Sequence, residues 1–549
     1  MTDKIIRGSG GPPPTPPSPT RAPDTLNSRQ FASIQDLISE GEIEGFATPS
    51  KASLTKGTTA YNNAALKDVF LNDTPILNST ASNTNPQTAD FNFQNVGFTP
   101  RFGTSNQEHI PGIESSQSTT AVGVTVTNSS AVTRQITNTN VDAVKVTITF
   151  PQLQKATDEG DLLGSSVDLK VQVQYNSGGY SDIISDTITG RTADAYQKEY
   201  RVNITGAFPV DIRVVRVTAD SSSSNLVDAF TWTSLGEIVD DKQTYLNSAY
   251  TNLRIDSEQF SSIPKRAFRI RGVKVRIPGA GASSSGTPTV DLQTGRIVYP
   301  SGYIFNGTMG AAVWCSCPAI ILLDLLVTKR YGFGTQISPD QSTDAKTYEN
   351  LDLFSFVAAS RYANELVSDG FGGQEARFSC NVNLQGSMEA YTLINELAGV
   401  MRCFPIWSEG SVTITQDKPT DPSYLFSLAN VGEGGFSYSG SSLKQRHSVI
   451  SVSYFNMDSR EIDYEVVEDS TAQAKLGIVK KDVKAFACTS RGQAQRLGKA
   501  ILFSEQNESE VVSFVTSIDA GAIVRPGSVI SVNDPVRGGE RRSGRINAA

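Results

Sequence analysis

The chain has 549 residues and a formal net charge of −8, from 48 basic and 56 acidic side chains. This length exceeds what one hydrophobic core can organise, so we expect about three to five domains. The 45 glycines and 25 prolines, with 38 % apolar residues, favour a composition of strands and turns. The negative balance argues against a surface built to grip nucleic acid, which needs a basic stripe.

The chain begins with a low-complexity arm. Residues 7–23 read RGSGGPPPTPPSPTRAP, in which glycine adds flexibility and proline favours an extended polyproline conformation. We expect residues 1–27 to be disordered, because this composition cannot bury enough apolar surface to offset the entropy lost on ordering. The alternative is a tether that wraps a neighbouring protein.

A short amphipathic helix is predicted after the arm. Four apolar residues recur at helical intervals before a glycine that can stop the helix: Phe31, Ile34, Leu37 and Ile38, then Gly41. Residues 42–46, EIEGF, then lead towards a strand.

Glu40, Glu42 and Glu44 alternate along this segment and raise the question of catalytic carboxylates. Side chains at i and i+2 of a strand share one face about 6–7 Å apart, and glycosidases place two carboxylates about 5–10 Å apart. Any E-x-E strand meets that condition, so the spacing carries little weight. Gly41 and Gly45 indicate a redirected chain, and we favour a solvated or interface role for the glutamates.

Period-two alternation of apolar residues dominates residues 80–235, which we interpret as an antiparallel β domain. Its clearest predicted strands are 141–150, 167–175 and 210–218. Further strands are predicted within residues 240–300, notably FRIRGVKVRI at 268–277.

The rest of the chain mixes helices and strands. Helical stripes are predicted through Leu351–Tyr362, through Tyr391–Met401 and over about 490–505, the last capped by Thr489 or Ser490. Predicted strands lie at 411–415, 447–455, 510–518 and 527–532. The basic stretch RGGERRSGR at 537–545 is expected to be flexible.

No residue is predicted to be catalytic, to bind a cofactor or to bind a metal, so we expect a protein that is not an enzyme. The two histidines, His109 and His447, have no nucleophile motif beside them. Cys315 and Cys317 form a C-x-C without the second pair that zinc sites usually show. Together with Cys380, Cys403 and Cys488 they are expected to be free and mostly buried thiols.

No export or membrane segment is apparent. The first residues lack the apolar core of a signal peptide. The longest apolar stretch, residues 319–327, contains Asp324 and is too short to span a bilayer.

Several segments resemble, in order, the tip attachment protein J (host specificity protein J) family of lambda-like siphophage tails. They are PDTLNSRQFASIQDLISEGEIEGF (23–46), DDKQTYLNSAYTNLRIDSEQF (240–260), WCSCPAIILLDLLVTKRYGFG (314–334), SDGFGGQEARFSCNVNL (368–384), MRCFPIWSEGSVTITQDKP (401–419), SSLKQRHSVISVSY (441–454) and VVEDSTAQAKLGIVKKDVKAFACTSRGQAQRLGK (466–499). The resemblance implies a multidomain, β-rich α+β fold of tail hub domains with an inserted antiparallel β domain.

The implied division has six parts. After the arm come the first part of a hub β domain (28–79), the inserted β domain (80–235), the return to the hub β domain (236–310), an α+β hub domain (311–440) and a second α+β or barrel-like hub domain (441–549). Family members usually continue into fibre modules, so the last part is expected to be truncated and host selection is expected to lie outside this chain.

The resemblance also implies a function. We expect a homotrimeric hub at the distal end of the tail tube, present in the virion tail tip and made in the host bacterial cytoplasm. The implied partners are the tail tube, other tail-tip proteins, the tape-measure protein and receptor-binding fibre modules, with transient passage of phage DNA and indirect contact with a host outer-membrane receptor. The alternative left open is a tail-associated cell-wall hydrolase that uses Glu42 and Glu44.

Overall fold

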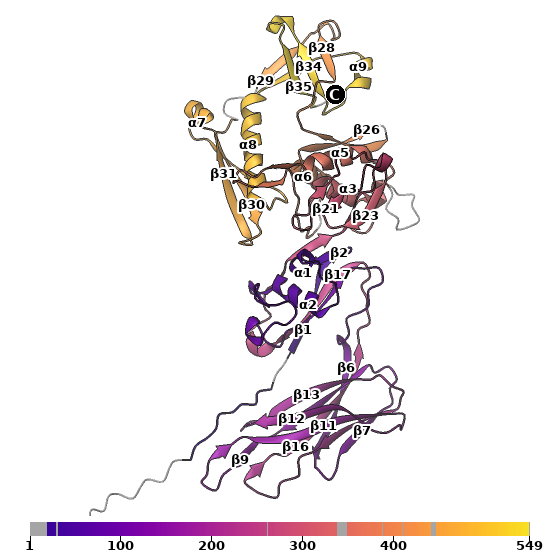
Figure 1. The fold of residues 1–549 in the computed structure, drawn as a ribbon, viewed down its shortest axis with the longest axis vertical. Coiled ribbons are helices and arrows are strands. Elements are labelled where there is room, and N and C mark those ends of the chain that lie inside the picture. Colours follow the sequence, from indigo (N-terminus) through magenta and orange to yellow (C-terminus); the bar gives the residue numbers. More distant parts are fainter. Residues whose placement is uncertain are drawn as a thin grey trace, which may run out of the picture.

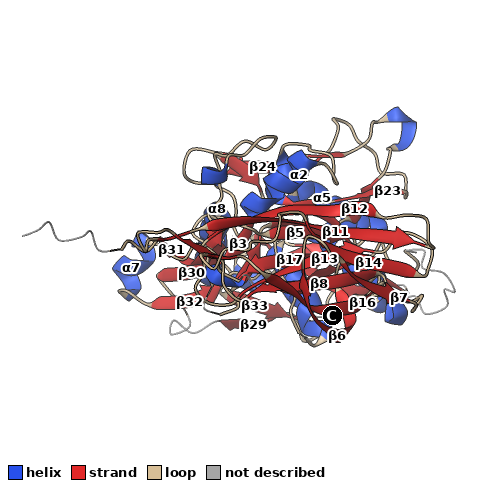
Figure 2. Ribbon diagram, turned by 90° about the horizontal axis from the view of Figure 1, so that it is seen from below, coloured by secondary structure: helices blue, strands red, loops and turns tan. Residues whose placement is uncertain are grey.

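The computed structural model describes residues 19–28, 31–260, 262–337, 348–386, 388–408, 410–440 and 446–547. Strands account for 41 % of the structure and helices for 18 %, which confirms the predicted β-rich α+β class (Figure 2). Five separate buried clusters of apolar side chains define five bodies. Figure 1 shows an elongated molecule with the sandwich of residues 114–240 at one end and the body of β28 (Tyr424–Ser427), β34 (Val529–Asn533) and β35 (Arg541–Arg545) at the other. The body of α8 (Arg491–Asn507) lies beside the body of α3 (Pro318–Val327).

The N-terminal body is built from residues 31–102 and 248–273, which lie far apart in the sequence. Its main sheet has the order β1 (Phe31–Glu40), β17 (Ser248–Asp256), β5 (Gly97–Phe102). The smaller elements are β2 (Ile43–Phe46) paired with β19 (Ile270–Val273), the sheet of β18 (Arg266–Phe268), β3 (Val69–Leu71) and β4 (Thr74–Pro75), and the helices α1 (Ala47–Lys51) and α2 (Thr59–Ala65).

The helix predicted between Phe31 and Gly41 is wrong, because this segment is the strand β1. It pairs antiparallel with β17 from Phe31–Asp256 to Glu40–Ser248. The supposed helical stripe is not a buried face, since Leu37 is 66 % exposed. Pairing with a distant strand overrides the local spacing.

The inserted β domain is a sandwich of two four-stranded antiparallel sheets (magenta to purple in Figure 1). One sheet has the order β12 (Ser181–Gly190), β11 (Ser165–Tyr175), β14 (Val210–Arg216), β7 (Val132–Ile136), and the other β13 (Tyr196–Asn203), β8 (Ala143–Phe150), β16 (Phe230–Asp240), β6 (Glu114–Val126). A small sheet of β9 (Gln154–Ala156), β10 (Leu162–Leu163) and β15 (Leu226–Val227) lies at its end. All three predicted strands are present, and their alternate residues fill the core around Trp232.

The sandwich spans residues 114–240, so the predicted boundaries at 80 and 235 are wrong. Residues 81–102 belong to the N-terminal body, where Phe91 and Phe98 pack beside Leu253. Strand β5 also pairs with β17 instead of a sandwich strand.

The predicted arm divides at residue 19. Residues 1–18 lie outside the described residues. Residues 19–28 are described, and Ala22 and Leu162 share a backbone hydrogen bond of 2.9 Å on the sandwich. The prediction of disorder is therefore wrong for residues 20–27.

The helical body, residues 275–416, packs around the buried helix α3 (Pro318–Val327). Its other elements are the ribbons β20 (Val275–Pro278) with β23 (Met309–Val313), β21 (Thr289–Val290) with β22 (Ile297–Val298), β24 (Leu366–Ser368) with β25 (Gln374–Ala376) and β26 (Cys403–Ser408) with β27 (Ser411–Gln416), and the helices α4 (Gly334–Ile337), α5 (Leu353–Ala363) and α6 (Ala390–Val400). Among the described residues, no helix is both long and apolar enough to cross a membrane.

The predicted domain 441–549 forms two bodies. In the α8 body, one face of the sheet β31 (Glu461–Glu468), β30 (Val449–Asn456), β32 (Lys480–Lys484) is covered by α8 (Arg491–Asn507), with α7 (Ser470–Leu476) beside it. Ser490 caps α8 as predicted, its hydroxyl accepting a hydrogen bond from the backbone N–H of Gln493.

The C-terminal body takes strands from both sides of the predicted boundary at 440. Its sheets are β28 (Tyr424–Ser427), β34 (Val529–Asn533), β35 (Arg541–Arg545) and β29 (Ser437–Gly440) with β33 (Glu510–Ser513), and α9 (Ile518–Ile523) lies beside them. The boundary is wrong because β28 pairs in parallel with the distant β34. The strand predicted through residue 518 ends at Ser513, where pairing with β29 ends, and the supposedly flexible 541–545 is a strand paired with β34.

The buried ion pair of the sandwich generates a stability prediction. Arg216, with a side chain 1 % exposed, donates to the Asp228 carboxylate at 2.7 Å and to the Asp228 carbonyl at 2.6 Å. Asp228→Ala removes the buried carboxylate and leaves this guanidinium with only the half-exposed Asp220 carboxylate, 3.2 Å from its Nε, so we expect a loss of about 3 kcal/mol in the free energy of unfolding. Denaturant unfolding followed by Trp232 fluorescence, with Trp314 and Trp407 replaced by Phe, measures it.

The matched control is Asp182→Ala, which removes an exposed ion pair with Lys170 in the same sandwich. Its expected cost is below about 1 kcal/mol. Equal losses in the two variants would contradict the prediction.

Candidate functional site at the acidic segment

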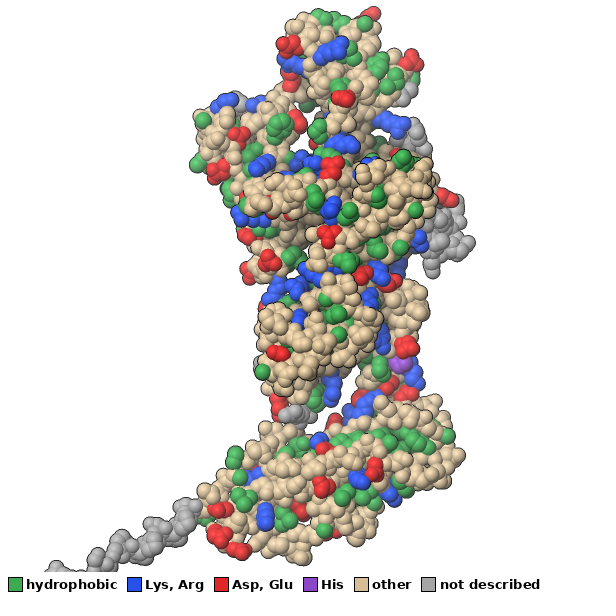
Figure 3. All heavy atoms as spheres, in the orientation of Figure 1, with side chains coloured by type: hydrophobic (Ala, Val, Ile, Leu, Met, Phe, Trp, Pro, Cys, Tyr) green, Lys and Arg blue, Asp and Glu red, His purple; other side chains and the backbone are tan. Residues whose placement is uncertain are grey.

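The segment that carries Glu40, Glu42 and Glu44 lies where the N-terminal body meets the helical body. Acidic and basic side chains gather at this level of the molecule (Figure 3). The segment leaves β1, turns at Gly41 and continues as β2, which pairs with β19. Strand β19 runs on into β20 of the helical body, so the two bodies share one backbone here.

Glu40 connects β1 to the turn that follows α3. The Arg330 guanidinium donates to the Glu40 carboxylate at 2.5 Å and to the Ser248 hydroxyl at 2.8 Å. The Ser248 hydroxyl in turn donates to Glu40 at 3.2 Å. This three-residue network joins segments almost 300 positions apart in the sequence.

Glu42 is held by Lys274, one residue before β20. The ammonium lies 2.6 Å from the carboxylate, and the backbone N–H of Lys274 donates to the Glu42 carbonyl at 2.8 Å. The Glu42 side chain is 40 % exposed, so the pair fixes position more than it adds stability.

Gly41 passes between the two bodies at close quarters. Its φ is +93°, and a Cβ there would lie 2.9 Å from the Tyr331 ring and 3.3 Å from Val273. The Tyr331 hydroxyl donates to the buried Asp324 of α3 at 2.7 Å. Burial raises the pKa of Tyr331, with Asp324 adding to the rise, so the ring stays neutral and fixed beside Gly41.

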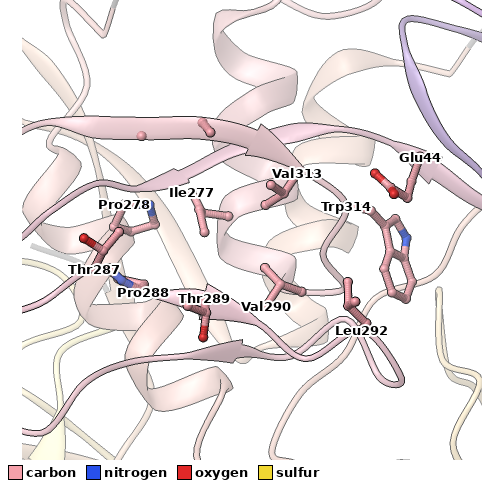
Figure 4. Close-up of a pocket in the computed structure, with 12 residues that line it drawn as sticks. Glu44, Ile277, Pro278, Thr287, Pro288, Thr289, Val290, Leu292, Val313 and Trp314 are labelled. Atoms are coloured by element: carbon pink, nitrogen blue, oxygen red, sulfur yellow. The ribbon is translucent and has the colours of Figure 1, made fainter. Parts of the chain in front are cut away.

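Glu44 lines a pocket of about 310 Å³ in the helical body. Figure 4 shows Glu44 and Trp314 at one end of it and Pro278 and Pro288 at the other. The apolar walls come mainly from β20, β21 and β23 and the residues next to them. Among its described lining residues, Glu44 is the one titratable group.

Arg271 makes a cation–π contact with Trp314, with the guanidinium carbon 4.5 Å from the centre of the indole ring. Its side chain is 2 % exposed, and within the described chain neither terminal nitrogen has a hydrogen-bond partner. Burial lowers the pKa of Arg271, and the nearby Glu44 opposes that shift.

The pocket lining includes Glu44 but not Glu42. Glu42 and Glu44 have different surroundings, one bound to Lys274 and the other on the pocket wall. Of the histidines, His109 lies between β5 and β6, and the His447 ring contacts Glu505 of α8 at 2.9 Å. The structure brings neither histidine into the pocket lining.

The five cysteines are all free and buried, which confirms that prediction. The Cys317 thiol donates to the Ser360 hydroxyl at 3.2 Å. No group of three metal-ligating side chains is found in the described ranges. The sequence patterns did not single out Arg330 or Arg271, and the signal that could have drawn attention to Arg330 is its place as the first residue of the glycine-rich stretch RYGFG at 330–334.

Comparisons with known proteins decide the resemblance. The family "Tip attachment protein J, FNIII-A domain" matches residues 116–241, which correspond to the sandwich, and "Putative phage tail protein" matches residues 389–549. Tip attachment protein J of Escherichia phage SECphi27 is 29 % identical over 537 residues, covering 97 % of this chain and 41 % of that protein. The same protein of Escherichia phage SECphi4 is 29 % identical over 548 residues, covering 98 % and 44 %.

The chain is similar to tip attachment protein J over nearly its whole length.

The resemblance indicated by the sequence segments is thus confirmed. The chain spans about two fifths of the length of these tip attachment proteins. Among solved structures, the virion of a gene transfer agent particle matches at 12 % identity and TM-score 0.32, covering 56 % of this chain and 62 % of that one. A 43 kDa tail protein of prophage MuSo2 from Shewanella oneidensis matches at 13 % and 0.25, covering 74 % and 88 %. Neither score supports a fold argument.

The close passage of Gly41 generates a prediction. Gly41→Ala forces a Cβ against the Tyr331 ring and strains the positive φ, so we expect a loss of about 1–3 kcal/mol in the free energy of unfolding. Gly57→Ala is the control, because Gly57 also has a positive φ of +82° but has nothing within 4 Å of its Cβ position. Thermal or denaturant unfolding that is equal for the two variants would contradict the role of the Tyr331 contact.

The buried thiols generate a second prediction. Burial raises the pKa of Cys380 and Cys403 to about 12 and that of Cys488 to about 11. Because the thiolate is the reactive form, a chromogenic disulfide reagent at pH 8 should modify less than about one thiol per folded chain. All five should react after denaturation. Rapid reaction of two or more thiols in the folded chain would disagree with this burial.

Proposed function

We propose that this chain is a structural component of a phage tail tip that acts in host attachment. The observation that carries the proposal is the similarity to tip attachment protein J along 97–98 % of the chain. The match of residues 389–549 to a putative phage tail protein supports it independently. The protein is made in the host cytoplasm and is located at the tail tip of the assembled virion.

In the finer form of the proposal, three copies form a hub at the distal end of the tail tube. The tube, the tape-measure protein and other tip proteins are its partners on one side, and receptor-binding fibre modules are its partners on the other. Contact with the host outer-membrane receptor is indirect. The elongated shape supports such a connecting role, because the sandwich and the C-terminal body present separate surfaces at its two ends (Figure 1).

Passage of phage DNA through the hub is part of the same proposal. The net charge of −8 suits a channel that must not retain phosphate. Much of the basic run at 265–276 is also neutralised within the chain, since Arg266, Arg269 and Lys274 pair with carboxylates.

The residues that line the pocket fit a structural role better than they fit hydrolysis of a bacterial cell wall. Glycoside hydrolysis needs two carboxylates that flank one bond. The described lining of the pocket offers Glu44 alone, while Glu42 is bound to Lys274. We therefore propose that the acidic segment is a structural joint and that the chain is not an enzyme.

The stoichiometry of the tail tip tests this proposal. Cryo-electron microscopy of tails that carry a tag on an exposed loop of the chain should show three copies around the tube axis at its distal end. The exposed turn at Ser177 and Gly178 of the sandwich accommodates such a tag. One copy or six copies per tip would contradict the trimer, and labelling elsewhere on the virion would contradict the hub.

A further inference from the structure

We infer that residues 19–28 form a strap that holds the sandwich in one orientation relative to the N-terminal body, with Arg191 as its anchor. The outer end of the strap lies on the small sheet of the sandwich. The backbone N–H and the hydroxyl of Thr20 donate to the Asp161 carboxylate at 2.6 and 2.7 Å. Leu162 donates to the Thr20 carbonyl and accepts from Ala22, both at 2.9 Å.

Arg191 binds the middle of the strap with its side chain and its backbone together. Its guanidinium is 2 % exposed and donates to the Ala22 carbonyl at 2.7 Å and to the Asp24 carboxylate at 2.5 Å. Its backbone N–H donates to the Thr25 hydroxyl at 3.1 Å, and its carbonyl accepts from the Thr25 N–H at 2.9 Å. Because the guanidinium is buried and its hydrogen bonds are directional, Arg191 fixes the position of residues 22–25 on the sandwich.

Gly190 permits this close approach. A Cβ on Gly190 would lie 2.5 Å from the Thr25 hydroxyl oxygen and 2.9 Å from Leu26. Leu26 packs against the core of the sandwich, and the Ser28 hydroxyl accepts from the backbone N–H of Gln197 at 2.9 Å. The sandwich surface is thus shaped for the strap over residues 20–28.

The strap attaches at a different place from the two chain connections that enter the sandwich. Those connections, 103–113 and 241–247, run together: Phe102 pairs with Ala249 at one end and Glu114 with Asp240 at the other. One double connection of this kind acts as a single hinge, and relative motion of domains is then the default expectation.

The second attachment removes that freedom. Gln197 is on β13, and β13 and β6 are opposite edges of the same four-stranded sheet. Three strand spacings, about 14 Å, separate the two edges across the sheet. Gln197 is also in register with Thr149 and Thr231, nine positions along β16 from Asp240 at the hinge, so the strap attaches near the opposite end of the sheet. Because Ser28 is only three positions before Phe31, the first residue of β1, the chain length between them is short and the strap ties the far edge of the sandwich to the N-terminal body.

The test measures distances between the two bodies in the full chain. Spin labels are placed at Lys51→Cys in α1 and Ser185→Cys in β12, both exposed, while the five native cysteines are buried. Pulsed electron–electron double resonance should give one narrow distance distribution for the parent, which is the spin-labelled full chain without further changes. Removal of residues 1–28 should widen it by at least about twofold, because the hinge is then unopposed.

The anchor is tested separately with Asp24→Ala/Thr25→Ala, whose changes lie outside the sandwich. This variant should also widen the distribution. The control Asp211→Ala, which removes a bond to Gln135 on the sandwich, should leave it unchanged. Unchanged Trp232 fluorescence shows that the sandwich is folded. A narrow, parent-like distribution without residues 1–28 would overturn the strap, and one in Asp24→Ala/Thr25→Ala would overturn the role of Arg191.

Discussion

The passage of Gly41 between Tyr331 and Val273 is the constraint on which the arrangement of the two central bodies depends. No side chain fits there, because a Cβ would lie 2.9 Å from the tyrosine ring. The flanking pairs Glu40–Arg330 and Glu42–Lys274 are largely exposed, with glutamate side chains 42 % and 40 % accessible, so each contributes little alone. The close packing at Gly41 therefore fixes how the two bodies meet, and the two ion pairs on either side of it align the contacting segments.

Ion pairs within the chain also explain why a strongly basic segment does not form a surface for nucleic acid. Residues 265–276 hold six basic side chains, and three of them pair with carboxylates from residues 36–68. Asp36 forms an ion pair with Arg266, and the buried Asp68 forms one with Arg269. Arg271 is the contrast, since it is buried against Trp314 instead of being paired. Charge in this region therefore serves internal cohesion.

What could be predicted followed from local patterns. The alternation in β8, β11 and β14 was readable because one side of each strand is buried in the sandwich core, and Ser490 was readable as a cap of α8. Strand β1 was misread because its residues are half-exposed and its partner β17 lies more than 200 positions away. The pairing of β28 with β34 and the contact of Glu40 with Arg330 are equally distant. Such contacts leave no trace in a local window.

The pairing of β1 with β17 also sets an order of events during synthesis. Phe31 cannot meet Asp256 until the whole sandwich, residues 114–240, has been made. Domains fold as units while the chain emerges, and all eight main strands of the sandwich lie within that interval. The sandwich therefore closes first, while β1 remains an open edge without its neighbour. A nascent chain in this state exposes Phe31 and Leu37 on an unpaired strand, so until residue 256 is made β1 is an edge with which another chain can pair.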